Sequence, residues 1–127
     1  MQSGWMHALA VALGGAVGAL LRWRVSLWLN PMPLPFALGT LVVNCTGGLL
    51  IGFSLVAFER HPNETLRLLL VTGGLGGLTT FSAYSAESLA LLVRGEPGVA
   101  LAHTLAHVLG ALAFAGLGWW AGRSLWP

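Results

Sequence analysis

Long apolar windows without charge alternate with short polar connections along the whole chain. The windows cover residues 5–21 with a continuation to 29, residues 36–58, residues 68–86 with an extension to 94, and residues 98–122. About 20 apolar residues, each rising 1.5 Å, cover roughly 30 Å of hydrocarbon, so each window is long enough to cross a membrane. The pattern predicts an all-α membrane protein of four transmembrane helices, with residues 1–127 forming a single four-helix transmembrane domain.

The connections carry the residues that stop helices. Asn30 and the prolines that follow it end the first window, and Pro62-Asn63 and Gly95-Glu96-Pro97 mark the second and third connections. Hydrophobic residues make up 56% of the chain and charged residues 8%, against roughly 45 to 50% hydrophobic residues in soluble domains. We therefore expect a multi-pass protein of the cell (inner) membrane, whose first window is a retained span and not a cleaved signal.

The number of arginines is the same on the two sides of the predicted membrane protein, so it does not indicate one orientation. The side with both chain ends carries Arg60, Arg67 and Arg123, and the opposite side carries Arg22, Arg24 and Arg94. Arginine excess normally marks the cytoplasmic side, so a tie indicates a chain that inserts both ways and can pair as an antiparallel homodimer. The alternative is that two of these arginines lie inside the first helix and do not belong in the count.

The 18 glycines of this helical chain need an explanation. Three pairs one helical turn apart, Gly14 with Gly18, Gly48 with Gly52, and Gly118 with Gly122, predict close helix packing in lipid. The run of glycines at 73–77 has a second interpretation, because it lies in the third window and predicts a helix broken near its middle. Lipid tolerates such a break only where the freed backbone is buried in protein or lines a wet cavity. The alternative is a kink that serves packing alone.

Hydroxyl and amide side chains gather around this segment. Thr79, Thr80, Ser82, Tyr84 and Ser85 follow the glycines in the third window, and Thr40 and Asn44 share one face of the second helix. An amide near mid-membrane should face the protein interior, where its simplest role is an interhelical hydrogen bond. Clustered donors beside a broken helix also support an anion path, although they do not by themselves identify the anion.

Three motifs, taken together with the length and the four-window layout, resemble the Fluc (CrcB) family of small fluoride channels. They are residues 14–23 (GGAVGALLRW), residues 39–44 (GTLVVN) and residues 76–82 (GGLTTFS). The resemblance implies an antiparallel, dual-topology homodimer with two pores and passive fluoride export that reduces fluoride toxicity.

The same resemblance implies roles for individual residues. The fluoride pore would be lined by Asn44, Phe81, Ser82, Tyr84, Ser85 and Thr40. Phe81 would present its electropositive ring edge to the ion, and Arg22 would stand at a vestibule and attract anions. Backbone carbonyls of Gly76 and Thr79 from both chains would hold a structural Na⁺ on the dimer axis. The chain departs from the family pattern at Tyr84, where a second phenylalanine is usual, and at Ala83, where a threonine is common.

Other interpretations compete with this one. His103 and His107 are four residues apart and could form half of a metal site, but interhelical hydrogen bonding is the simpler role. Glu87 is the one carboxylate expected inside the hydrocarbon, and it could pair with an arginine or a helix terminus. A small dual-topology drug/proton antiporter would share this layout, but its natural first-helix carboxylate is missing. The sequence shows neither a catalytic triad nor a Walker motif.

Overall fold

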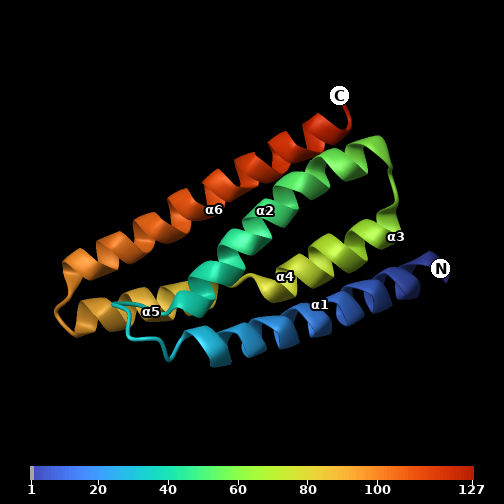
Figure 1. The fold of residues 1–127 in the computed structure, drawn as a ribbon. Coiled ribbons are helices and arrows are strands. Elements are labelled where there is room, and N and C mark those ends of the chain that lie inside the picture. The colour runs from blue at the N-terminus through green and yellow to red at the C-terminus, as the bar shows by residue number, and fades with distance from the viewer. Residues whose placement is uncertain (1) are drawn as a thin grey trace.

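The computed structural model describes residues 2–127, and every regular element in that range is a helix (Figure 1). The first residue of the predicted domain, 1–127, lies outside the described range. The elements are α1 (Gln2–Leu29), α2 (Leu38–Arg60), α3 (Glu64–Arg67), η1 (Leu68–Leu75), α4 (Gly76–Leu78), α5 (Phe81–Val93) and α6 (Pro97–Leu125). Four helical stretches are long and apolar enough to cross a membrane, with α3, η1, α4 and α5 together making the third. The prediction of four spans is confirmed.

The spans run up and down, and the connections alternate between two ends of the molecule. Figure 1 shows the N-terminus, the α2–α3 connection and the C-terminus at one end, with the α1–α2 loop and the α5–α6 turn at the other. The α5–α6 turn uses Gly95 at a positive φ of 75°, which glycine adopts without a Cβ penalty. Pro97 then opens α6, where its missing N–H costs nothing. Large apolar side chains cover the outside of the chain, as expected when lipid is the solvent.

Glycines bring the helix backbones into contact. A Cβ at Gly14 or Gly18 of α1 would collide with the backbone of η1 and α4, and one at Gly118 of α6 would collide with Leu49 of α2. Gly52 of α2 meets the backbone of α6 in the same way. The predicted small-residue packing is confirmed, and it pairs α1 with the first half of the third span and α2 with α6.

The glycine run of the third span is helical, so the expectation that these glycines themselves interrupt the helix is wrong. Gly76 has φ −62° and ψ −36°, and residues 68–75 form a π-helix, which is wider than an α-helix. Gly73 and Gly77 face α1 closely, where any side chain would meet its backbone. The extended residues come just afterwards: Thr79 has φ −84° and ψ 154°, and Thr80 has φ −151° and ψ 117°. The glycines therefore allow α1 to pack closely against the third span, and the helix is interrupted at Thr79 and Thr80, where the backbone is extended.

Candidate functional site

The Asn44 side chain holds the two extended residues in place. Its Oδ1 accepts the N–H of Thr80 at 2.8 Å, and its Nδ2 donates to the carbonyl of the same residue at 3.0 Å. The same Nδ2 lies 3.2 Å from Nδ1 of His107 on α6. The predicted interhelical hydrogen bonding of Asn44 is confirmed. One amide thus ties α2 to both the third span and α6, and it satisfies both backbone groups of one threonine.

The change of path at Thr79 and Thr80 redirects the helical hydrogen bonds. In a continuous helix the N–H of Thr80 would donate to the carbonyl of Gly76, but here it donates to Asn44. The N–H of Ala83, which would reach the carbonyl of Thr79, donates instead to the Thr80 hydroxyl at 3.1 Å. The carbonyls of Gly76 and Thr79 therefore lose their helical donors, and oxygen ligands of this kind suit a hard cation such as Na⁺. These carbonyls are the kind of ligand that the resemblance implies for Na⁺, and the ion stays a prediction.

Arg22 reaches this region from α1. Its Nε donates to the carbonyl of Gly77 in α4 at 2.9 Å. In a continuous helix this carbonyl would accept the N–H of Phe81, but Phe81 begins the separate helix α5. The guanidinium thus caps the end of the short helix and places a positive charge beside the extended residues. The predicted position of Arg22 at a vestibule stays a prediction.

A cleft of about 310 Å³ opens beside the extended residues. Its lining comes from α2, the third span and α6: Asn44, Thr79, Thr80, Phe81, Tyr84, His107, Val108 and Ala111. Phe81 is 78% exposed, although it lies in the first turn of α5. Its ring centroid is 5.2 Å from that of Tyr84 in a tilted arrangement. Three of the six predicted pore residues therefore meet at one cleft.

Tyr84, the departure from the family pattern, is anchored by its added hydroxyl. The hydroxyl donates to Oγ1 of Thr104 on α6 at 3.0 Å, and the ring stacks on that of His103 with 5.3 Å between centroids and 14° between planes. The hydrogen of this hydroxyl is thus used inside the chain. The cleft keeps an aromatic ring beside Phe81, fixed by α6.

The two predicted pore serines lie on the exposed face of α5. Ser85 donates to the carbonyl of Phe81 at 2.9 Å, and Ser82 lies 3.2 Å from the Thr80 hydroxyl. Neither serine lines the cleft within this chain. Their part in a pore stays a prediction, as does that of Thr40, which is 3% exposed and faces α5.

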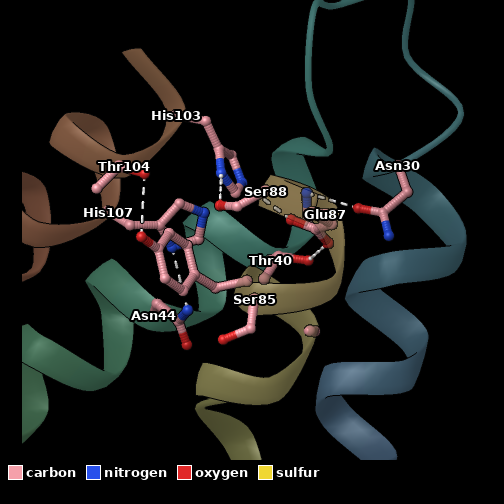
Figure 2. A network of polar contacts seen from close by, with 12 residues as sticks. Asn30, Thr40, Asn44, Ser85, Glu87, Ser88, His103, Thr104 and His107 are labelled. Atoms are coloured by element: carbon pink, nitrogen blue, oxygen red, sulfur yellow. Dashed lines mark hydrogen bonds and ion pairs between the residues drawn. The ribbon is translucent and has the colours of Figure 1, made fainter. Parts of the chain in front are cut away.

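Glu87 belongs to a polar network between α2, α5 and α6 (Figure 2). Its carboxylate accepts a short hydrogen bond from the Thr40 hydroxyl, and its other oxygen lies 3.1 Å from Nε2 of His103. Nδ1 of the same histidine is 2.9 Å from the Ser88 hydroxyl. The expectation that Glu87 pairs with an arginine or a helix terminus is wrong, because the buried imidazole of His103 is closer. The four-residue spacing of the two histidines was the available signal for this network.

The fold and the cleft define a multi-pass membrane protein whose interior gathers polar side chains beside extended backbone in the third span. The profile of the family described as "CrcB-like protein, Camphor Resistance (CrcB)" matches residues 9–119. That match covers most of the sequence, and the chain belongs to this family.

Individual relatives support the same conclusion. The chain is 49% identical over 119 residues to a protein of Cupriavidus pinatubonensis, covering 92% of this chain and 94% of the relative. It is 47% identical over 115 residues to one of Bordetella petrii, covering 89% and 88%. It is 50% identical over 113 residues to one of Aromatoleum aromaticum, covering 87% and 86%. All three relatives are named fluoride-specific ion channel FluC.

Proposed function

We propose that this protein conducts fluoride passively and selectively across the cell (inner) membrane, and so limits fluoride toxicity. The observation that carries the proposal is the pair of hydrogen bonds from Asn44 to Thr80, which fix two extended residues at a cleft that Phe81 lines. The names of the relatives support fluoride as the ion. They give no support to the antiporter alternative, and Glu87 is engaged by Thr40 and His103.

Fluoride is small and strongly hydrated, so a narrow pore has to replace its water with close donors. Phe81 offers the positive edge of its ring, and its 78% exposure leaves that edge available. The hydroxyls of Ser82 and Ser85 lie on the exposed face of α5, where a bound ion can compete for their hydrogens. Arg22 adds positive charge near the end of α4, which raises the local anion concentration.

A second copy of the chain in the opposite orientation completes the pathway in this proposal. Phe81, Ser82 and Ser85 are all exposed in the single chain. Facing lipid, they could not contact an ion in a water-filled path, so a second subunit has to cover them. Arg22 and Arg24 lie within α1, and Arg22 donates to a carbonyl of the third span, so the arginine count does not argue for two orientations and this part of the proposal rests on the exposed face of α5. A dimer that covers this face of α5 would carry two pores, each lined by both subunits.

A structural Na⁺ on the dimer axis is the second part of the proposal. The carbonyls of Gly76 and Thr79 would hold it, because the N–H groups that would bind them in a continuous helix donate elsewhere. A cation at this place supplies fixed positive charge between the two extended segments. Four carbonyls, two from each chain, would stabilise the antiparallel pairing.

Flux measurements test the proposal directly. Purified protein in liposomes loaded with fluoride should release it rapidly without a proton gradient, as read by a fluoride electrode, and chloride should not follow. Replacing Phe81 by isoleucine should abolish the flux while the protein stays folded, because the side chain is 78% exposed and contributes little to the core of the chain. Unaltered flux in this variant would remove Phe81 from the pathway.

The serines offer a matched pair of variants. Ser85 and Ser124 are both exposed, and each donates its hydroxyl to the carbonyl four residues earlier. Ser85→Ala should slow fluoride efflux, whereas Ser124→Ala, which removes the same bond near the C-terminus, should leave it unchanged. Equal effects would show that the loss comes from helix stability and not from contact with the ion.

A further inference from the structure

We propose that Glu87, His103 and His107 form a binding site for a transition-metal dication, with Zn²⁺ as the reference ion. Each residue offers one ligand atom, and these atoms lie within 4.8 Å of one another. Two imidazoles and a carboxylate are a ligand set that Zn²⁺ takes in proteins, with bonds of about 2.0–2.2 Å and one position left open. This site differs in place and chemistry from the carbonyl site proposed for Na⁺.

The spacing of the cluster is close to what coordination requires. Tetrahedral Zn²⁺ separates its ligand atoms by roughly 3.4 Å, and Glu87 Oε2 already lies 3.1 Å from His103 Nε2. His107 is one helical turn away on α6, with its ring centroid 4.5 Å from that of His103. With all three ligand atoms within 4.8 Å of one another, coordination requires the third to move closer by about 1.4 Å or less.

An unpartnered nitrogen is the second observation. His107 is 5% exposed, and its Nε2 has no hydrogen-bond partner among the described residues. Nδ1 of the same ring is the nitrogen that contacts Asn44. A buried polar nitrogen without a partner is unfavourable, and a metal ion at Nε2 would supply the missing partner. Ligation through Nε2 places the hydrogen on Nδ1, so Nδ1 of the ring and Nδ2 of Asn44 are both donors and their hydrogen bond is lost, while the two bonds between Asn44 and Thr80 remain.

The surroundings already provide the second layer of contacts that metal sites use. The Thr40 hydroxyl donates to the Glu87 carboxylate, which orients it. The Ser88 hydroxyl lies 2.9 Å from Nδ1 of His103 and can accept the hydrogen of that nitrogen when Nε2 binds the metal. Such outer contacts fix the orientation and tautomer of a ligating histidine. Figure 2 shows these side chains converging from α2, α5 and α6.

Two hollows adjoin the site. Glu87 lines a hollow of about 260 Å³ whose other walls include Asn30, Phe36 and Arg94. The charge of Arg94 is paired with Glu96 at 3.2 Å, which weakens its repulsion of a cation. On its other side the cluster reaches the 310 Å³ cleft through His107. A metal ion bound here would therefore lie between the two hollows.

Direct binding tests the proposal without relying on channel activity. The full chain without a polyhistidine tag, stripped by chelator and kept in detergent, is titrated with Zn²⁺ against a chromophoric chelator. We expect one saturable site per chain. Glu87→Gln and His103→Asn should weaken it by more than the roughly 10- to 100-fold that outer-contact changes cause, and Ser88→Ala should fall within that range.

The control is His61→Asn, which removes an exposed histidine at the opposite end of the molecule, beside Trp126. Its Zn²⁺ affinity should equal that of the wild type. X-ray absorption of the Zn²⁺-loaded wild type reports the ligands without any variant, so the test does not depend on whether a variant folds. Two imidazoles with oxygen ligands at about 2.0–2.2 Å are expected. Absence of saturable binding, or fewer than two imidazoles, would overturn the proposal.

Discussion

Replacing Asn44 by alanine should free the backbone of Thr80 while leaving most of the helices intact. The amide accepts the Thr80 N–H at 2.8 Å and donates to the Thr80 carbonyl at 3.0 Å, and alanine can do neither. A donor or acceptor left unsatisfied in a buried place costs about 1–3 kcal/mol. The two groups together put the cost at about 2–6 kcal/mol, and the lower end applies if water from the cleft replaces the amide.

Amide hydrogen exchange measures this effect at one residue. In detergent micelles, the Thr80 N–H should exchange roughly 5- to 150-fold faster in Asn44→Ala, which corresponds to the loss of about 1–3 kcal/mol of local protection. Fluoride efflux from liposomes should fall in parallel, because Phe81 begins α5 directly after the residue that is freed.

Asn30→Ala is the matched control. The Asn30 side chain also accepts a backbone N–H, that of Gly39 at 2.9 Å, but it does so in the α1–α2 loop. This variant should change exchange at the start of α2 and leave Thr80 as it is. If Thr80 exchanges at the wild-type rate in Asn44→Ala, the amide does not hold the extended segment and the reasoning about these hydrogen bonds fails.

Three further predictions concern stability, measured by thermal unfolding in detergent. Gly18→Ala should destabilise the chain by about 1–3 kcal/mol, because a Cβ there collides with the backbone of the third span, whereas Gly116→Ala, with nothing within 4 Å, should be neutral or slightly stabilising. Equal effects would remove close packing as the reason. Tyr84→Phe should cost about 1 kcal/mol through the lost hydrogen bond to α6 and keep fluoride efflux; abolished efflux would mean that the hydroxyl serves the ion. Thr40→Val should cost about 1.5–3 kcal/mol by removing a donor to the α5 carboxylate, and Thr46→Val, exposed on the same helix, should cost far less.

The four spans could be predicted from sequence because the signal is a simple count of apolar residues between charges. The structure moves the ends by only a few residues; α2, for example, begins at Leu38 and ends at Arg60. Close packing at Gly14 and Gly18 was also predictable, since two small residues one turn apart form a flat helix face.

The path of the third span shows where a local pattern is insufficient. Glycine is a poor helix former in water, but here tertiary contact with α1 keeps Gly73 and Gly77 helical. The extended backbone falls instead at Thr79 and Thr80, where an amide from a distant helix supplies the missing hydrogen bonds. The partner is 36 residues away in the sequence, so propensity alone could not place it.

The histidine network could be predicted only in part. Spacing on one helix linked His103 with His107, and interhelical hydrogen bonding was the expected role, which the contacts with Glu87 and Asn44 confirm. The third member of the cluster, Glu87, comes from the preceding helix. The crossing of α5 and α6 decides which residue it meets, and sequence spacing carries no information about that crossing.

The measurement that tests the central claim most directly is the reversal potential of single channels in a planar bilayer with fluoride on one side and chloride on the other. If the cleft at Asn44 and Phe81 conducts fluoride selectively, current should reverse at a strongly displaced voltage set by the fluoride gradient, and Phe81→Ile should carry no current. A reversal near zero, or current that persists in that variant, would contradict selective conduction through this cleft.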